Sequence, residues 1–131
     1  MAHCLKGNEI ILLEGNLGSG KTTFTKFLVK ALGGDENEVN SPTFTIMNEY
    51  ETPKHRIFHI DLYRVDSFDI TDFVNEGIIV IEWPKEDYSV YNLPVLKISF
   101  SVIDDISRKL TVKSLHDADY ILFCLSSSNP I

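Results

Sequence analysis

The stretch Gly15-Asn16-Leu17-Gly18-Ser19-Gly20-Lys21-Thr22 follows the pattern G-x-x-x-x-G-K-[ST], the signature of a phosphate-binding loop. Its glycines let backbone N–H groups turn toward phosphate oxygens in conformations that a side chain would obstruct. Lys21 brings a positive charge to the β- and γ-phosphates, and the Thr22 hydroxyl can bind Mg²⁺. The helix expected to follow adds the attraction of its N-terminal dipole for anions. The predicted nucleotide-binding residues are Gly15, Asn16, Leu17, Gly18, Ser19, Gly20, Lys21, Thr22 and Thr23.

The residues on either side of the loop have the patterns of a strand and a helix. Residues 9–14 (Glu-Ile-Ile-Leu-Leu-Glu) form a short apolar run, which is typical of a buried parallel strand. After the loop, apolar residues recur at the spacing of one helix face, and Gly33-Gly34 supplies a stop. The residues of the expected face are Phe24, Phe27, Leu28, Ala31 and Leu32. Strand, loop and helix together are the context that the motif requires.

The middle of the chain predicts four further elements. Residues 43–50 and 57–63 have strand character and are separated by a turn, so they predict a β-hairpin. Residues 67–76 predict a short helix, with Ser67 as its candidate N-cap and a glycine after its end. The continuous β-branched run at residues 78–81 predicts a fully buried parallel strand.

The C-terminal third predicts a strand pair and a last segment that fits either a helix or a strand. Residues 95–102 and 109–112 are expected to be antiparallel strands, whereas residues 115–125 fit a helix or a strand. The whole pattern predicts an α/β fold: a P-loop NTPase-like three-layer α/β/α arrangement with a mostly parallel central sheet plus antiparallel strands. The length of 131 residues predicts one domain, residues 1–131, in which residues 115–131 have no assigned structure.

Two carboxylates at strand ends are candidates for completing the site. Glu82 is the first charged residue after the apolar strand, which would deliver it beside the loop, where Mg²⁺ needs a ligand. Asp61 also closes an apolar strand, where it can hold the metal through water or orient the attacking water. Thr43 follows a proline and is a candidate γ-phosphate sensor. The predicted catalytic residues are Asp61, Glu82 and Thr43, and the predicted metal ligands are Thr22 and Glu82. A solvated or capping role at the strand end is the alternative for each acid.

Two ring-bearing residues lie next to these acids. His59 alternates with Asp61 on one face of the expected strand, and we interpret it as a hydrogen-bonded structural residue and not a catalytic one. Trp83 is the only tryptophan, and the sequence leaves both packing and nucleotide contact open for it.

The charge of the chain argues against direct binding of nucleic acid. Twelve basic and nineteen acidic residues give a formal net charge of −7, and no block of lysines or arginines offsets it. A negative field repels nucleic-acid phosphates, so tight binding to RNA or DNA would need the basic surface of a partner.

Cysteine usage and hydropathy predict a cytoplasmic protein. Cys4 and Cys124 are isolated and near opposite ends of the chain, so we expect free thiols and neither a disulfide nor a metal pair. Residues 1–8 lack the apolar stretch of a signal peptide. The apolar runs of the regular segments do not exceed four residues, so no membrane span is expected.

Four separated motifs occur together in the order and spacing of the TsaE (YjeE) family. They are residues 15–22, 41–45 (Ser-Pro-Thr-Phe-Thr), 59–64 (His-Ile-Asp-Leu-Tyr-Arg) and 81–84 (Ile-Glu-Trp-Pro). The chain resembles bacterial TsaE over residues 5 to 112, and the combination is far more specific than the loop alone. Two departures are Asn16, where the family usually has Asp, and a shortened region at residues 85–94.

The resemblance implies a small P-loop ATPase that uses ATP and Mg²⁺. In the family, TsaE works with TsaB and TsaD to make the N6-threonylcarbamoyl group on adenosine 37 of ANN-decoding tRNAs. TsaD carries the transfer chemistry, and ATP hydrolysis by TsaE supports turnover of the complex. By motif, Lys21 and the loop amides would bind phosphates, Thr22 with Glu82 would hold Mg²⁺, Asp61 would act in hydrolysis, and Thr43 would lie in a switch-like segment. The expected partners are TsaD and TsaB, with tRNA reached only through them, which agrees with the acidic charge.

Three other classes of P-loop protein fit the loop less well. A small-molecule kinase usually clamps the transferring phosphoryl group with several arginines, and this chain has only Arg56, Arg64 and Arg108, widely spaced. A GTPase would need an Asn-Lys-x-Asp segment, which the sequence lacks. A non-catalytic, nucleotide-dependent adaptor is the remaining alternative.

Overall fold

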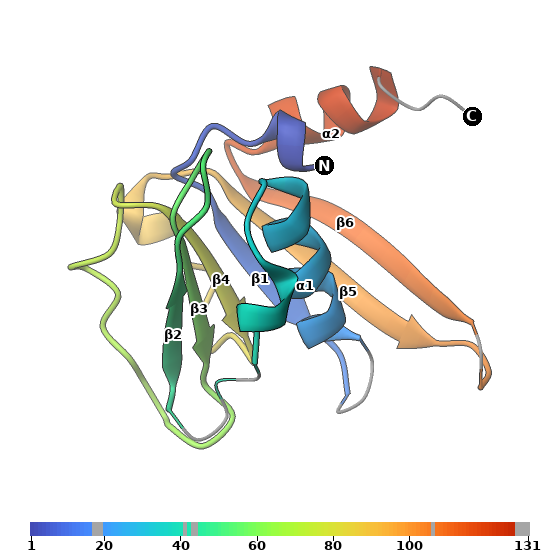
Figure 1. Cartoon of the computed structure of the whole chain (residues 1–131), viewed down its shortest axis with the longest axis horizontal. Helices are drawn as coiled ribbons and strands as arrows, with labels where there is room; N and C mark the ends of the chain where they lie inside the picture. The colour runs from blue at the N-terminus through green and yellow to red at the C-terminus, as the bar shows by residue number, and fades with distance from the viewer. Residues whose placement is uncertain (17–19, 41, 43–44, 106, 128–131) are drawn as a thin grey trace.

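The protein is built on one six-stranded sheet, as its computed structural model shows (Figure 1). The structure describes residues 1–16, 20–40, 42, 45–105 and 107–127. The strands are β1 (Ile10–Glu14), β2 (Met47–Tyr50), β3 (Ile57–Asp61), β4 (Ile78–Glu82), β5 (Val95–Val102) and β6 (Arg108–His116). The helices are α1 (Lys21–Ala31), α2 (Asp119–Ser127) and three 3₁₀ turns: η1 (Ala2–Cys4), η2 (Glu36–Glu38) and η3 (Ser89–Tyr91).

The sheet has a parallel centre and antiparallel edges, in the order β2-β3-β4-β1-β5-β6. Strands β3, β4, β1 and β5 run parallel, whereas β2 and β6 are antiparallel to their neighbours. Every residue of β3 and β4 is buried, because parallel strands in this class of fold are covered on both faces. The mixed α/β, mostly parallel fold predicted from the sequence is therefore confirmed.

The connections of β1 and β4 leave the sheet in opposite directions. The chain goes from β1 through α1 toward β2 and β3 on one side, and from β4 to β5 on the other. Strands β4 and β1 are neighbours, with Leu13 opposite Glu82. In open α/β sheets, ligands bind outside the carboxyl ends of strands at such a switch point. The topology therefore predicts a ligand site at the carboxyl ends of β1, β4 and β3.

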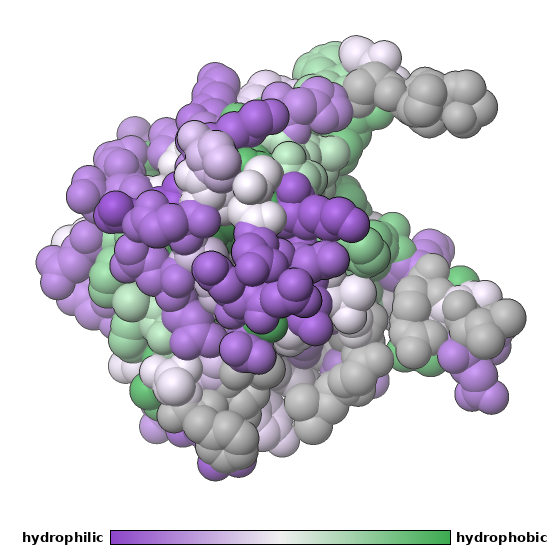
Figure 2. All heavy atoms as spheres, in the orientation of Figure 1, coloured by the Kyte–Doolittle hydropathy of each residue, from purple (hydrophilic) through white to green (hydrophobic). Residues whose placement is uncertain are grey.

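The α-helices cover one face of the sheet, and connecting segments that include η3 cover the other. Helix α1 lies across the sheet in Figure 1, and η1 sits beside α2 at the top of the view. Leu28, Val29 and Leu32 from the α1 region pack with sheet residues such as Ile11 and Val80. On the other face, Leu62, Ile70, Tyr88 and Leu93 come from connecting segments and cover Ile10, Leu12, Ile79 and Ile81. Hydrophilic side chains cover most of the outer surface on the side that carries α1 (Figure 2).

The buried face of α1 differs from the predicted one. Its inward residues are Lys21, Thr25, Leu28 and Val29, whereas Phe27 is 62% exposed. Of the expected apolar face, only Leu28 and Leu32 are fully buried. The loop fixes this rotation, because it places Lys21 at the site, and Thr25 on the same side satisfies its hydroxyl by donating to the Lys21 carbonyl. A prediction from hydrophobicity alone places polar residues such as Lys21 and Thr25 on the solvent side of the helix.

The predicted helix at residues 67–76 does not form. The chain makes turns at residues 71–76 instead, with Phe73 N–H and Val74 N–H both donating to the Ile70 carbonyl. Asn75 then adopts a left-handed backbone with φ of 66°, which ends the turn. The candidate cap Ser67 is also wrong, since the Asp69 carboxylate is the side chain that accepts from the Thr71 N–H.

The hairpin and the C-terminal strands form largely as predicted. Strands β2 and β3 pair antiparallel, although β2 begins at Met47 because Thr45 and Ile46 donate to the Pro42 carbonyl in a turn. Residues 43–44 of the expected strand lie outside the described residues. Strand β6 extends to His116, and the last apolar segment, which fitted either structure, becomes helix α2.

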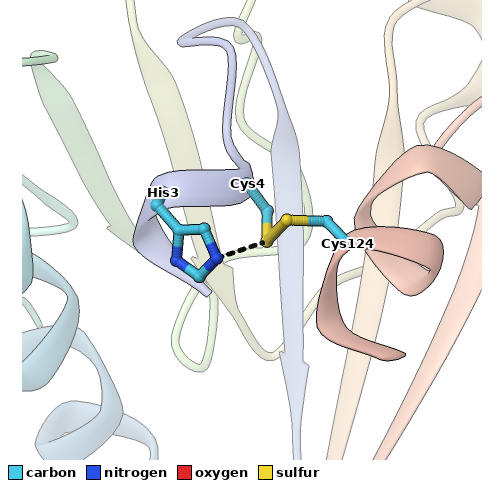
Figure 3. A group of neighbouring side chains, drawn as sticks. All are labelled: His3, Cys4 and Cys124. Carbon is cyan, nitrogen blue, oxygen red and sulfur yellow. Dashed lines mark hydrogen bonds between the residues drawn. A yellow bond between two sulfur atoms is a disulfide. The ribbon is translucent and has the colours of Figure 1, made fainter. Parts of the chain in front are cut away.

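The prediction of free thiols is wrong, because Cys4 and Cys124 form a disulfide (Figure 3). The bridge joins η1 to α2 across 120 residues of sequence, with the two Cα atoms 5.8 Å apart. His3 lies beside it, with its Nε2 3.6 Å from the Cys4 sulfur. The pairing depends on how the ends of the chain pack against each other, which spacing in the sequence does not reveal. The compartment prediction loses the support that it drew from free thiols.

A buried carboxylate joins the same two ends. Glu9 is fully buried and accepts hydrogen bonds from the backbone N–H groups of Lys6 (2.6 Å) and Gly7 (2.9 Å) and from the Tyr120 hydroxyl. Burial, together with this contact to Glu9, raises the pKa of Tyr120, so the hydroxyl stays protonated and donates. The turn before β1 is therefore fixed to α2 independently of the disulfide.

Helices of the described ranges are too short or too polar to cross a lipid bilayer.

The disulfide is expected to stabilise the fold. Closing a loop of this length constrains the unfolded chain by up to about 5 kcal/mol in the chain-entropy model. We predict that replacing Cys4 and Cys124 by Ser lowers the free energy of unfolding by about 2–5 kcal/mol, measured by urea denaturation. Dithiothreitol should lower the stability of the unchanged protein to that of the double variant and leave the variant unaffected. Equal stability under oxidising conditions would contradict a formed bridge.

Candidate functional site

Three parallel strands bring the predicted site residues to one edge of the sheet. Strand β1 ends at Glu14 and leads into the phosphate loop, β3 ends at Asp61, and β4 ends at Glu82. The register places Asp61 directly opposite Glu82, and Glu82 opposite Leu13. Helix α1 begins with Lys21 after the loop. The expectation that both carboxylates meet beside the loop agrees with this placement, while their chemical roles remain predictions.

The glycines at the ends of the loop have the backbone that the motif requires. Gly15 has φ of 153° and Gly20 φ of 106°, in the region that side chains disfavour. Gly20 is the N-cap of α1, so the amides that follow it point out of the helix start. Leu17, Gly18 and Ser19 lie outside the described residues, as does the predicted switch residue Thr43. Thr23 is exposed on the first turn of α1.

The Lys21 ammonium is held between a carbonyl and an aromatic ring. Its Nζ donates to the Gly15 carbonyl at 2.6 Å and lies 3.6 Å from the centre of the Trp83 ring. The residue is only 5% exposed, and this burial lowers the pKa of Lys21, while the negative charges of Glu82 and Asp61 oppose the shift. The Lys21 ammonium therefore already has two uncharged partners, the Gly15 carbonyl and the Trp83 ring, with which a phosphate would compete.

Trp83 reaches the lysine because the chain turns sharply after β4. Its backbone is left-handed, with φ of 60°, a conformation that costs a non-glycine residue about 1–3 kcal/mol. The indole also packs on the Tyr63 ring, with centres 4.9 Å apart. Trp83 and Pro84 face Glu14, Gly15 and Asn16 across a cleft of about 320 Å³, which is within the size range of small-molecule sites.

Thr22 and Glu82 form the pair predicted to hold a metal. The Thr22 hydroxyl donates to Glu82 Oε2 at 3.4 Å, although 60 residues separate them in sequence. Glu82 is 4% exposed. A hydroxyl and a carboxylate are oxygen donors of the kind that Mg²⁺ prefers, and Mg²⁺ usually takes only a few protein ligands alongside phosphate and water. The donor set therefore fits this ion.

Asp61 is buried beside the same groups. Asp61 is 4% exposed, and its Oδ1 accepts a hydrogen bond from the Tyr63 N–H at 2.8 Å. Its charge is one of those that raise the pKa of Lys21 against the effect of burial, which reflects its closeness to the loop. Asp61 thus caps the turn after β3 and also contributes negative charge to the site, so the structural and the catalytic interpretation are compatible.

His59 and Tyr50 extend the site into the core. His59 is fully buried, and its Nε2 lies 2.5 Å from Glu82 Oε2. Its Nδ1 is 3.0 Å from the Tyr50 hydroxyl. Burial raises the pKa of Tyr50, which keeps this hydroxyl protonated. The interpretation of His59 as a hydrogen-bonded residue is correct, but sequence reasoning missed Tyr50. The position of Tyr50 in the hairpin was the signal that could have found it. Asn48 lies opposite His59, and Tyr50 lies two residues further along the same face.

Comparison with known proteins gives a consistent result. The family model described as threonylcarbamoyl adenosine biosynthesis protein TsaE matches residues 1–110. A protein of Aquifex aeolicus named tRNA threonylcarbamoyladenosine biosynthesis protein TsaE is 45% identical over 113 residues, which cover 86% of this chain and 82% of that protein. The protein of the same name from Rickettsia prowazekii is 32% identical over 126 residues, covering 92% and 85%. The crystal structure of Bacillus subtilis YdiB superposes with a TM-score of 0.68 at 26% identity, covering 97% of this chain and 82% of that one.

The contact between Lys21 and Trp83 predicts a spectroscopic response to nucleotide. Phosphates compete with the indole ring and the Gly15 carbonyl for one ammonium group, so ATP should change the fluorescence of Trp83, the only tryptophan. In Lys21→Met, ATP binding should weaken by at least about tenfold, because a charged hydrogen bond to phosphate is lost. Lys26→Met, an exposed lysine on the same helix, is the matched control. Calorimetric ATP binding with no fluorescence change would contradict the contact.

Proposed function

The chain belongs to the TsaE family, and from this premise we propose that it is the ATP-binding and ATP-hydrolysing subunit of tRNA threonylcarbamoyladenosine biosynthesis. In this proposal its hydrolysis supports turnover of a TsaB–TsaD complex, which modifies adenosine 37 of ANN-decoding tRNAs. The chain covers 82% and 85% of the two TsaE proteins compared above.

One observation supports hydrolysis most strongly. Lys21, Thr22, Asp61 and Glu82 come from three separate parts of the chain and converge at the switch point of the sheet. A loop that only bound phosphate would need the lysine and the backbone amides, whereas two buried carboxylates beside it are what a metal and an attacking water require.

The residues have distinct proposed roles in this site. Lys21 and the loop amides bind the phosphates, and Lys21 exchanges the Gly15 carbonyl and the Trp83 ring for phosphate oxygens. Thr22 and Glu82 are the proposed ligands of Mg²⁺, which, when bound, neutralises charge on the β- and γ-phosphate oxygens. Asp61, which accepts a hydrogen bond from the Tyr63 N–H, orients the attacking water or accepts a proton from it. Thr43 is retained as a proposed γ-phosphate sensor because it follows Pro42 and matches the switch-like segment of the family.

The partners proposed are TsaD and TsaB, with tRNA contacted only through them. A formal charge of −7 disfavours direct contact with tRNA, and a role in tRNA modification implies a cytoplasmic location. The kinase alternative gains nothing from the structure, because Arg56 is engaged by Glu51 and Glu49 on the hairpin, at 2.6 and 3.3 Å.

We predict that Glu82→Gln retains ATP binding but lowers Mg²⁺-dependent hydrolysis by about 100-fold, since the neutral amide is a poor ligand for Mg²⁺. The measurement is phosphate release by the chain together with TsaB and TsaD. Glu86→Gln, an exposed acid four residues later, is the matched control and should hydrolyse ATP normally. Equal hydrolysis rates for Glu82→Gln and the unchanged protein would reject the metal-ligand role of Glu82. A normal hydrolysis rate for Asp61→Asn would show that Asp61 only caps the turn after β3.

The same variants test the pathway in cells. Depletion of the chain should reduce threonylcarbamoyladenosine in tRNA, measured by mass spectrometry of nucleosides. The unchanged gene and Glu86→Gln should restore the modification, whereas Glu82→Gln should not. Modification that stays at its normal level after depletion would reject the proposed pathway. Restoration by Glu82→Gln would reject the need for hydrolysis and favour a non-catalytic adaptor.

A further inference from the structure

A chain of hydrogen bonds leads from the candidate metal site into the core. It starts at Thr22 and Glu82, continues from Glu82 Oε2 to His59 Nε2 at 2.5 Å, and passes from His59 Nδ1 to the Tyr50 hydroxyl at 3.0 Å. It ends on the backbone of Asn40, whose carbonyl lies 3.1 Å and whose N–H lies 3.3 Å from the Tyr50 hydroxyl oxygen. The proposed function uses the first two residues of this chain and gives the other three no role.

The three side chains in the middle of this network are buried in the sheet. Tyr50, His59 and Glu82 lie on the neighbouring strands β2, β3 and β4, with exposures of 3%, 0% and 4%. Tyr50 packs in the cluster that includes α1, so its ring is fixed as well as its hydroxyl. Asn40 is itself held, because its carbonyl also accepts from the Asn48 side chain at 3.2 Å. Side chains fixed at this depth cannot exchange their partners for water.

The hydrogen-bond inventory of the groups defines the direction of the chain. The Glu82 carboxylate is an acceptor, so His59 must donate to it from Nε2–H. In neutral imidazole the other nitrogen, Nδ1, is then an acceptor. The one proton of the Tyr50 hydroxyl can go to Nδ1 at 3.0 Å or to the Asn40 carbonyl at 3.1 Å. Because that carbonyl also accepts from the Asn48 side chain, the Tyr50 proton serves Nδ1. The Asn40 N–H in turn donates to the Tyr50 oxygen. Each link thus selects the orientation of the next, as a second partner of a metal-bound histidine selects its tautomer.

The consequence falls on the Glu82 carboxylate. Both hydrogen bonds that it accepts within the described part of the chain end on Oε2, from Thr22 and from His59. The histidine therefore fixes the rotation of the carboxylate and leaves Oε1 to take another ligand. Groups that orient a metal ligand in this way typically change metal affinity or activity by about 10–100-fold when they are removed.

We propose that His59 and Tyr50 are positioning residues that hold Glu82 in the orientation needed for binding a divalent cation. The inference rests on the proposed role of Glu82 as a metal ligand and deepens it. It assigns no contact with nucleotide to either residue. It requires that the hydrogen bond between the Tyr50 hydroxyl and Nδ1 holds the imidazole of His59 in the Nε2–H tautomer.

The decisive variant is Tyr50→Phe, which removes one buried hydroxyl and keeps the ring. We expect it to weaken Mn²⁺ binding to the ATP complex by about tenfold, measured by electron paramagnetic resonance, and to lower turnover at subsaturating Mg²⁺ by a similar factor. Affinity for ATP without metal should not change. Tyr88→Phe is the matched control, since Tyr88 is 2% exposed but lies on the opposite face of the sheet.

Two histidine variants separate positioning from packing. His59→Gln can still place an N–H near Glu82, whereas His59→Leu fills the space without a donor. We expect Gln to recover part of the Mn²⁺ affinity that Leu loses. Nitrogen NMR of the histidine ring should show the Nε2–H tautomer in the unchanged protein and a mixture in Tyr50→Phe.

The outcomes separate this proposal from the proposed function. Unchanged Mn²⁺ affinity in Tyr50→Phe and His59→Leu would overturn the positioning role, as would an equal loss of metal-free ATP binding, which would indicate general disruption. If the unchanged protein binds Mn²⁺–ATP and Tyr50→Phe weakens it, but no ATP is hydrolysed even with TsaB and TsaD, the positioning role stands and the hydrolytic function falls.

Discussion

Burial of charge at the carboxyl ends of β1, β3 and β4 is the constraint on which the rest of this structure depends. Lys21, Asp61 and Glu82 are each at most 5% exposed. An ionised group at that depth loses hydration worth several kcal/mol and must recover it from nearby partners. The opposite charges offset one another, as the effect of both acids on Lys21 shows. The site therefore cannot be altered at one residue without leaving another uncompensated.

The same constraint explains features that look unrelated. Helix α1 turns a lysine and a threonine inward because the loop, and not hydrophobicity, fixes its rotation. Trp83 accepts a left-handed backbone, and the ring that this places beside Lys21 compensates part of the buried charge. The core beneath the site contains a fully buried histidine and a tyrosine because Glu82 needs a donor that water cannot supply. The N- and C-terminal segments are stabilised separately, through Glu9 and the disulfide.

Sequence patterns predicted the parts that depend on neighbouring residues. The β-branched run before Glu82 predicted a buried parallel strand, and the apolar run before Asp61 predicted a strand of the hairpin, each with an acid at its end. Features that depend on distant packing were not predicted. The segment at 67–76 has a candidate N-cap and a following glycine but forms turns against the sheet. The disulfide needs η1 and α2 side by side. The link from Tyr50 to His59 needed the register of a hairpin, which spacing alone leaves undetermined.

The most direct test of the account is the position of a bound metal. Crystals grown with Mn²⁺ and a non-hydrolysable ATP analogue would locate the ion by its anomalous scattering. We predict one strong peak bound by the Thr22 hydroxyl, the Glu82 carboxylate and phosphate oxygens, with Lys21 moved from the Trp83 ring to the phosphates. A peak away from Thr22 and Glu82, or a nucleotide bound without metal while Lys21 stays under Trp83, would contradict it.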